Sequence, residues 1–349
     1  MNKDGMNRRD FLKTTVGAGA VLVAGGAMGG TKAAYGALKM AELDKLVITI
    51  ITDNYYDALR PDAPVTKRFR TQPGKSMHAE HGLSYFIETK RDGKTGVFMF
   101  DYGLDAQGVK KNMDVLGLDV GRAEGFGLSH GHFDHWGGFT EILAMNRARI
   151  KKGAPFYLGE GAFEQRYSLV PGTGERLDIG RLSRADIEAA RLVEIVEVTN
   201  PTEVMPGGYF SGKVEQVTDY EKIPPGLLVK RGEAVVVDTF PGEQAMAFNV
   251  KGKGLVVVSS CAHRGIVNTV KHVQKISGVE KVYAVIGGFH LVNAKPEVIE
   301  KTVADMKTIN PAYIVPAHCT GFEATVAFAK AMPGSFILNT AGTRYTFSA

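Results

Sequence analysis

Residues 128–138 (LSHGHFDHWGG) constrain the possible folds of this chain more than any other segment. They place three histidines and an aspartate within six residues: His130, His132, Asp134 and His135. Side chains two residues apart in an extended segment project to the same side, so His130 and His132 can bind one cation together. Asp134 and His135 lie where the chain turns into a helix, so they can reach a second cation position beside the first. Burying these groups without partners would be costly, so the pattern predicts a metal site on a strand-to-helix turn.

Strand-like runs rich in β-branched and aromatic residues alternate with amphipathic stretches from residue 46 onward. The predicted strands are 46–52, 83–89, 97–101, 124–129, 192–198, 234–239, 255–259, 282–286 and 313–315. Apolar residues recur at helical spacing in four stretches: Val109, Met113 and Leu116; Ile266, Val270 and Val273; Ile299, Val303 and Met306; Phe322, Val326 and Ala329. These stripes indicate helices packed on a core, and the mixture predicts a layered α/β architecture. Residues 151–191 show no clear strand and are interpreted as an insertion or lid.

The first 36 residues have the features of an export signal. Arg8 and Arg9 in the stretch NRRDFLK precede an apolar run at 16–28, and the segment ends in small residues such as Ala34 and Gly36. This pattern resembles a twin-arginine signal, although a basic amphipathic helix is the alternative. We therefore expect the twin-arginine export machinery as a partner, cleavage after Gly36 and a periplasmic protein of residues 37–349. The apolar run is shorter than the roughly 20 residues of a membrane span, so no stable anchor is expected.

Charge and cysteine content exclude several classes of protein. The 349 residues carry a formal net charge of +5, of which the predicted leader accounts for +3. The remainder gives no case for nucleic-acid binding. Two cysteines exclude a disulfide scaffold and a cysteine-only zinc module.

The motif HxHxDH on a strand-to-helix turn resembles that of the metallo-β-lactamase superfamily. The resemblance implies a four-layer αββα sandwich with one or two divalent metal ions at one edge of the sheets, zinc before iron or manganese. Residues 101–103 (DYG) are similar to the superfamily's Asp-x-Gly turn, which supports the site.

Further ligands are expected from the ends of later strands. His263 and His318 each follow an apolar strand and are the main candidates. Superfamily members usually have a histidine in a PGH turn and a bridging aspartate; here Glu243 and Cys261 stand at those positions. Glu243 can be a ligand or a surface turn residue, Cys261 can be a ligand or a small buried hydrophobic residue, and His263 can replace the missing histidine. A disulfide between Cys261 and Cys319 would compete with ligation by Cys261.

Several more segments resemble a subgroup, the dihydropterin ribofuranosylaminobenzene phosphate synthase-like metal-dependent hydrolases. The matching pieces are Asp53-Asn54, 79–88, 129–138, 241–245, 261–270, 286–291 and 316–321. His290 follows a strand at the same edge and is a candidate general acid, substrate contact or ligand. His81 is a candidate for orienting substrate or water. Arg264 and Asn268, at the start of a helix, suit an anionic substrate group, whereas His272 is expected to face solvent.

The reaction these features favour is hydrolysis of a small ester, thioester, lactone or phosphoester by a metal-bound hydroxide, with Asp134 and His290 as catalytic residues. Three alternatives stay open. The first is a synthase joining a pterin-like and a ribosyl-arene phosphate partner, although export argues against cytoplasmic biosynthesis. The second is a diiron redox enzyme, which His132 disfavours because such enzymes generally have glutamate there. The third is a non-catalytic binding protein.

Overall fold

The computed structural model describes residues 38–349 with the exception of residue 171. The predicted export signal therefore lies outside the described part of the chain. Gly36–Ala349 form one compact unit. Among the described residues, no helix combines the length and apolar character needed to cross a membrane.

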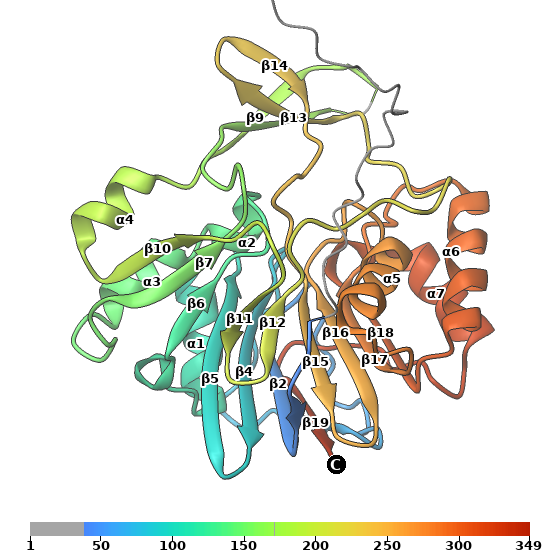
Figure 1. Cartoon of the computed structure of the whole chain (residues 1–349). Coiled ribbons are helices and arrows are strands. Elements are labelled where there is room, and N and C mark those ends of the chain that lie inside the picture. The colour runs from blue at the N-terminus through green and yellow to red at the C-terminus, as the bar shows by residue number, and fades with distance from the viewer. Residues whose placement is uncertain (1–37, 171) are drawn as a thin grey trace, which may run out of the picture. The chain divides into compact units, whose positions relative to one another are not determined.

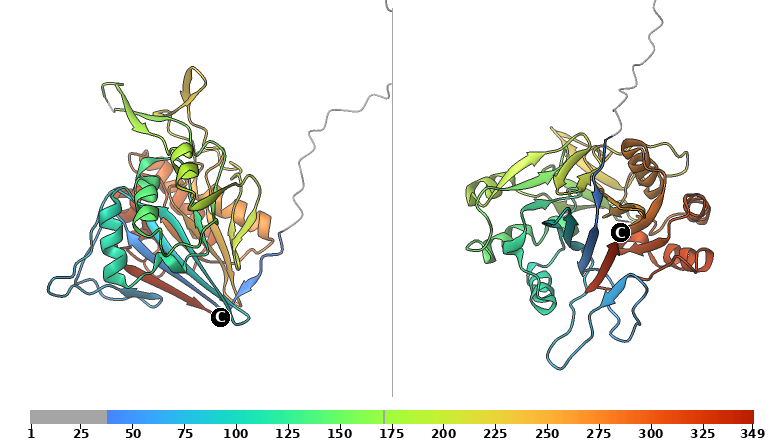
Figure 2. Two further views of the ribbon diagram at one scale, coloured as in Figure 1. Left: turned by 90° about the vertical axis from the view of Figure 1, so that its left-hand side faces the viewer. Right: turned by 60° about the horizontal axis from the view of Figure 1, so that its bottom comes forward.

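Two large β-sheets pack face to face in the described part of this unit, with helices on their outer faces (Figure 1; Figure 2). The first has eight strands in the order β10 (Val193–Glu197), β7 (Ala154–Leu158), β6 (Gly125–Gly127), β5 (Lys94–Tyr102), β4 (Ser84–Arg91), β2 (Lys45–Thr52), β19 (Thr343–Ser348) and β3 (Thr66–Arg68). The second has the order β11 (Thr202–Met205), β12 (Gly208–Phe210), β15 (Met246–Val250), β16 (Gly254–Ser259), β17 (Val282–Gly288) and β18 (Tyr313–Ala317), with β1 (Glu42–Leu43) beside β15.

The helices form the two outer layers. α1 (Ala106–Leu116), α2 (Phe133–Trp136) and α3 (Phe139–Met145) lie against the first sheet, and α5 (Ile266–Ser277), α6 (Pro296–Ile309) and α7 (Phe322–Ala331) against the second. One hydrophobic core lies between the sheets and one lies under each helical layer. This arrangement confirms the predicted αββα sandwich.

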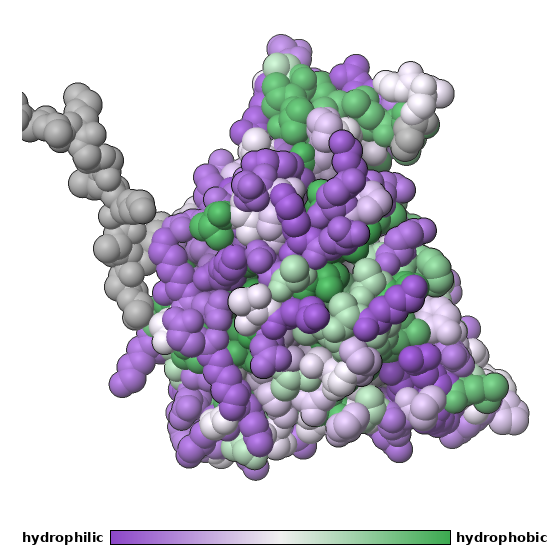
Figure 3. All heavy atoms as spheres, turned by 90° about the vertical axis from the view of Figure 1, so that its right-hand side faces the viewer, coloured by the Kyte–Doolittle hydropathy of each residue, from purple (hydrophilic) through white to green (hydrophobic). Residues whose placement is uncertain are grey.

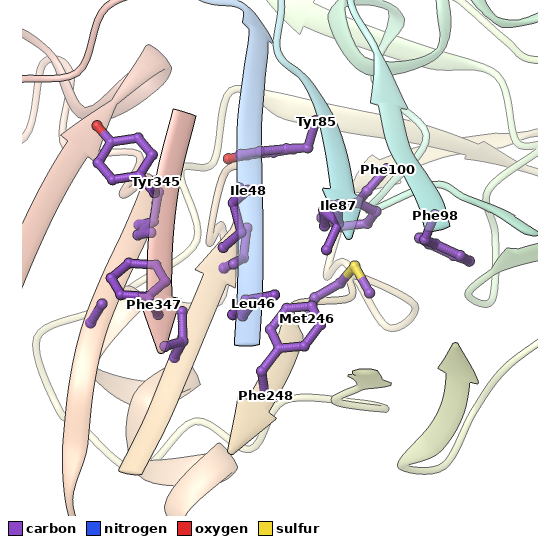
Figure 4. Packing of buried hydrophobic residues seen from close by; sticks show 14 of the residues in the cluster. Leu46, Ile48, Tyr85, Ile87, Phe98, Phe100, Met246, Phe248, Tyr345 and Phe347 are labelled. Carbon is purple, nitrogen blue, oxygen red and sulfur yellow. The ribbon is translucent and has the colours of Figure 1, made fainter. Parts of the chain in front are cut away.

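The core between the sheets is built from alternate residues of neighbouring strands (Figure 4). The residues labelled there are Leu46, Ile48, Tyr85, Ile87, Phe98, Phe100, Met246, Phe248, Tyr345 and Phe347. On β5, Phe98 and Phe100 face this core, whereas Val97 and Met99 face the helical layer. Both faces of the strand are covered, which explains why its sequence is a continuous apolar run. Each predicted strand is present, with ends that differ by up to three residues.

A smaller sheet stands apart from the two large ones at the top of Figure 1. It has the order β14 (Ala234–Val237), β13 (Leu227–Arg231), β8 (Arg166–Leu169) and β9 (Arg176–Gly180), and we call it the lid sheet. The expectation of no strand in residues 151–191 is therefore wrong. That segment supplies β7 to the first large sheet, β8 and β9 to the lid sheet, and α4 (Arg184–Ala190). The charged sequences of β8 and β9 lack alternation because neither face of this small sheet enters a main core.

Two expectations about side-chain orientation are also wrong. Phe322 on α7 is 77% exposed, and Val326 and Ala329 line an open cavity of about 550 Å³ instead of the core, which α7 reaches through Ala324 and Phe328. Hydrophobic patches do interrupt the hydrophilic surface on the side that carries α6 and α7 (Figure 3). His272 does not face solvent: it is buried, with Nε2 3.0 Å from the carbonyl oxygen of Ser211.

Removing a large side chain from the core between the sheets tests this packing. Phe100 is fully buried beside Tyr85 and Phe210, at ring-centroid distances of 5.8 and 5.7 Å. We expect Phe100→Ala to lower the free energy of unfolding by about 3–5 kcal/mol, because it removes buried area and leaves a cavity. Urea denaturation measures the change. Leu59→Ala, at a side chain that is 91% exposed, is the control and should change it by less than about 0.5 kcal/mol. Equal effects of the two changes would contradict this placement of the core.

Candidate metal centre

The predicted ligands meet at one edge of the sandwich. Residues 130–135 follow β6 and lead into α2, while Cys261 and His263 lie between β16 and α5. His318 follows β18, and β16, β17 and β18 are mutually parallel. Parallel strands deliver the loops at their carboxyl ends to the same edge of a sheet. The topology thus brings together residues that are distant in the sequence.

A first group of donors consists of three buried imidazoles. Side-chain nitrogens of His130, His132 and His263 all lie within 4.8 Å of one another. The Nε2 atoms of His130 and His263 are 3.2 Å apart. The structure therefore places His263 beside the first two motif histidines, where the superfamily pattern has the histidine that this sequence lacks.

A second group lies beside the first. Oδ2 of Asp134 is 3.2 Å from Nε2 of His318 and 3.5 Å from Nε2 of His135. The His318 side chain is fully buried; its Nε2 faces the Asp134 carboxylate, and its Nδ1 has no hydrogen-bond partner among the described residues. Asp134, His135 and His318 thus present a set of imidazoles and a carboxylate of the kind that binds divalent ions.

The thiol of Cys261 lies between the two groups. Its Sγ is 3.2 Å from Nε2 of His135. It also belongs to donor sets with His130 and His135 and with His263 and His290. Cys261 and Cys319 are both buried free thiols, so the structure contains no disulfide between them.

The pKa shifts differ between the two groups. Burial lowers the pKa of His130, His132 and His263 well below the usual value, which keeps these three imidazoles neutral, as ligation requires. In the second group, burial raises the pKa of Asp134, but His135 and His318 outweigh this effect, lower the pKa and hold the carboxyl ionised. Burial in turn lowers the pKa of His318, but Cys319 and Asp134 raise it to about 9, so a metal ion binding at His318 would release a proton. The residues present thus fit one or two divalent ions, and the donors suit zinc or iron.

Asp101 orients His135. Its carboxylate accepts hydrogen bonds from Nδ1 of His135 at 2.7 Å, from the amide of Ser129 at 2.8 Å and from the Ser260 hydroxyl at 2.5 Å. The bond to Nδ1 leaves Nε2 of His135 directed at the donor cluster. Asp101 adopts a left-handed conformation, φ +56°, which is uncommon outside glycine. The Asp-x-Gly turn therefore has the supporting position that the resemblance implied.

Asp53 supports His318 in a similar way. Its carboxylate accepts the His318 amide at 2.9 Å and Nδ2 of Asn339 at 2.7 Å. Nδ2 of Asn54 donates to the His318 carbonyl at 3.1 Å. In the sequence, Asp53 and Asn54 stand out only because they match the subgroup that the chain resembles. Nothing in the residues around them indicates that they contact a loop about 265 positions away.

Glu243 holds a ligand loop in place. Its two carboxylate oxygens accept the amides of His263 at 2.8 Å and Arg264 at 3.0 Å. Burial raises the pKa of Glu243 to about 7, against the lowering effect of these amides. Glu243 is buried, so the alternative of a surface turn residue is wrong, and its carboxylate is occupied by the two amides of the ligand loop.

The predicted substrate contacts by Arg264 and Asn268 need correction. Arg264 donates through Nε to the Val214 carbonyl at 2.7 Å and through Nη1 to the Thr239 carbonyl at 2.6 Å. Asn268 is fully buried: Oδ1 accepts two backbone amides and Nδ2 donates to the Arg264 carbonyl. Both side chains hold loops against α5, and the fully buried Asn268 cannot contact a substrate.

His81 and His290 lie on either side of the donor cluster. The His81 ring stacks on His318 with a centroid distance of 4.8 Å, and its Nε2 is 3.6 Å from Oδ2 of Asp134. Its side chain is 62% exposed, so it faces the approach to the cluster. The His290 ring is 4.1 Å from that of His263, and its buried Nδ1 has no partner within the described part of the chain.

A cavity of about 670 Å³ opens beside the cluster. His263 and His290 form part of its wall, the lid sheet contributes Leu169 and Leu227, and the loop before α6 contributes Leu291. Its lining also includes Lys222 and Lys295, which are exposed and form no ion pair with any residue that the structure describes. The cavity is large enough for a small organic ligand.

Known proteins similar to this chain come from two comparisons, whereas no protein-family model matches the sequence. The 7,8-dihydropterin-6-methyl-4-(beta-D-ribofuranosyl)-aminobenzene-5'-phosphate synthase of Methanocaldococcus jannaschii is 34% identical over 261 residues, covering 74% of this chain and 87% of that protein. An uncharacterized protein of the same organism is 28% identical over 255 residues, covering 72% of this chain and 88% of that one.

A solved structure supports the fold. A metal-dependent hydrolase of the beta-lactamase superfamily superposes with a TM-score of 0.67 at 24% sequence identity, covering 87% of this chain and all of that chain. The αββα sandwich described above is therefore the metallo-β-lactamase fold. Because the identity to the archaeal synthase extends over most of both proteins, this chain belongs to the family of that synthase.

Proposed function

We propose that this protein is a metal-dependent hydrolase acting on a small ester, thioester, lactone or phosphoester. One observation carries the proposal: two adjacent groups of buried metal-type donors converge at one edge of the sandwich, and His263 of the first group lines a cavity that can admit a small molecule. A purely structural histidine cluster would need neither this convergence of donors nor an adjoining cavity.

His130, His132 and His263 would hold one ion, and Asp134, His135 and His318 a second, with the Cys261 thiol between them. Divalent ions bound there would activate water and polarise the bond to be cleaved. Asp134 would orient the attacking water, and exposed His81, close to its carboxylate, would receive a proton. His290, on the cavity wall, would donate a hydrogen bond to the leaving group.

The cavity lining indicates the kind of substrate. Leucine side chains from the lid sheet and from the loop before α6 would pack on an apolar portion of the substrate. Lys222 and Lys295 would bind an anionic group, since neither has an ion-pair partner within residues 38–349 as described. We therefore propose a small, partly apolar, anionic substrate.

A second candidate function is a synthase reaction, and the 34% identity to the archaeal synthase favours it. The name of that protein describes a product in which a 7,8-dihydropterin is joined to a ribofuranosyl-aminobenzene phosphate. Mass spectrometry of incubations with these two kinds of partner distinguishes the candidates. A joined product without hydrolysis of any ester would establish the synthase and reject the hydrolase.

Metal removal and His132→Ala test the hydrolase directly. Turnover of nitrophenyl esters and phosphodiesters should vanish on chelation and return with zinc, iron or manganese. His132→Ala should lower kcat/KM by at least about 100-fold, because even residues that only orient metal ligands contribute about 10- to 100-fold. His78→Gln is the matched control, because His78 contacts Glu80 outside the donor groups and should leave the rate unchanged. Activity that survives both chelation and His132→Ala contradicts the proposal.

Replacing the two lysines tests the anionic substrate. Lys222→Ala and Lys295→Ala should each raise KM for an anionic ester about 3- to 10-fold with little change in kcat, since they remove binding and leave the reacting groups intact. KM for a neutral ester of the same size should not change. Lys330→Ala, at an exposed position on α7, is the control. Unchanged KM for the anionic ester in both variants would reject this substrate class.

Export by the twin-arginine machinery to the periplasm is a further proposal, supported by the stretch NRRDFLK. Such export suits a protein that acquires metal before it crosses the membrane. Arg8→Lys combined with Arg9→Lys should retain the protein in the cytoplasm at its full length, as cell fractionation would show. Export of that double variant would contradict the proposed route.

A further inference from the structure

A buried ion pair joins the lid sheet to the loop that carries the motif histidines. Nε of Arg166, at the start of β8, donates to Oδ2 of Asp238 at 2.8 Å, and the two side chains are 3% and 1% exposed. Asp238 directly follows β14, so the pair closes the base of the lid sheet from both of its hairpins. A surface ion pair would stabilise little, but a buried pair is costly to break because one charge is left without its partner.

The Arg166 guanidinium also reaches into the metal-binding motif. It donates to the carbonyl of Gly131 at 3.4 Å, and to the carbonyls of Gly161 at 2.9 Å and Glu164 at 3.2 Å. Gly131 lies between the ligands His130 and His132. A Cβ at Gly131 would overlap the guanidinium, so the close approach of Arg166 requires glycine at this position.

Asp238 acts on the same cluster from the other side. Its Oδ1 accepts the amide of Phe240 at 2.8 Å, which stabilises the left-handed conformation of that residue at φ +47°. The Phe240 ring lies flat on His263, with centroids 4.0 Å apart and an interplanar angle of 14°. It also meets the His132 ring edge-on at 5.2 Å. One carboxylate therefore fixes both Arg166 and the aromatic ring that contacts all three clustered histidines.

We infer that Arg166 and Asp238 are positioning residues that couple the lid sheet to the first donor group. Through Gly131 and Phe240 they set the orientation of His130, His132 and His263 toward a bound ion. The lid sheet then does more than line the cavity. The contacts at its base determine how closely the three imidazole rings can approach one bound ion. The inference concerns metal retention and does not depend on which reaction the centre performs.

Trp136 provides a reporter of this network. It is the only tryptophan in the sequence. Its Nε1 donates a hydrogen bond at 3.0 Å to the Gly131 carbonyl, which also accepts a hydrogen bond from Arg166. Gly180, at the end of β9 in the lid sheet, lies against its indole ring. The fluorescence of Trp136 therefore reports on the junction between the lid sheet and the motif loop, with or without metal.

The test is the zinc affinity of Asp238→Asn, measured by competition with a chromogenic chelator. This change keeps size and an oxygen for the Phe240 amide but removes the charge that Arg166 needs. We expect zinc affinity to fall at least about 10-fold, the effect typical of residues that orient metal ligands. Lys230→Met is the matched control, because Lys230 is an exposed residue of β13 in the same lid sheet and its side chain forms no hydrogen bond or ion pair with Arg166 or Asp238 among the described residues. It should retain affinity within about twofold.

Two further measurements separate coupling from general loss of structure. Arg166→Met should lower zinc affinity at least as much as Asp238→Asn, because it removes the hydrogen bond to Gly131 as well as the ion pair, and the double variant should lower it no further than Arg166→Met. In metal-free protein, both variants should shift the emission of Trp136 while circular dichroism stays unchanged.

Wild-type zinc affinity in folded Asp238→Asn, additive losses in the double variant, or an unshifted Trp136 emission would each overturn the inference. If the single variants fail to fold, Arg166→Lys, which keeps the charge, must restore folding and most of the affinity; failure to do so overturns it as well.

Discussion

The carboxylate of Asp101 holds the two halves of the molecule together at the edge where the donors meet. It accepts hydrogen bonds from Ser129 and His135, which belong to the first half, and from Ser260, which follows β16 in the second. A buried carboxylate of this kind is tolerated only where several donors satisfy it, and here the donors come from both sheets. The same contacts bring Cys261 to within 3.2 Å of His135. The arrangement of the whole cluster therefore depends on this one side chain.

Several other buried carboxylates share the task of holding ligand loops. Asp53 binds the backbone of His318, Glu243 binds that of His263, and Asp238 fixes Phe240 over the same histidine. His263 and His318 thus each have a carboxylate that holds the backbone of the ligand loop without being a donor of the cluster itself. Such supporting contacts make the site rigid, which limits the choice of metal and the orientation of whatever binds beside it.

The strands and the motif could be predicted because their signals are local. Continuous apolar runs such as that around Phe98 report burial on both faces, and the spacing of His130, His132, Asp134 and His135 is itself the site. Orientation was harder to predict. The stripe at Phe322 has helical spacing, but nothing in one helix shows whether its apolar face meets a core or an open cavity. Of the lid sheet only β14 was predicted as a strand, and the sheet itself was missed because its central pairing, β8 with β13, joins segments about 60 residues apart.

Roles that depend on long-range contacts were the least predictable. Arg264 and Asn268 suited an anionic ligand by their position at a helix start, but the backbone of residues 214–218 takes their hydrogen bonds. Glu243 has a carboxylate that could bind a metal ion. In the structure, however, both of its oxygens accept hydrogen bonds from the amides of His263 and Arg264. In each case a side chain that could bind a substrate or a metal ion forms hydrogen bonds to the backbone of a loop instead. Only the three-dimensional arrangement shows these contacts.

We propose that His130, His132 and His263 form one metal position and that Asp134, His135 and His318 form a second beside it. Diffraction from crystals of the metal-loaded protein, recorded on both sides of the metal's absorption edge, locates the ions. We expect anomalous peaks within these two donor groups, with the sulfur of Cys261 next to them. Crystals grown with excess metal that show no peak at either group, or peaks only elsewhere on the molecule, would rule out these metal positions.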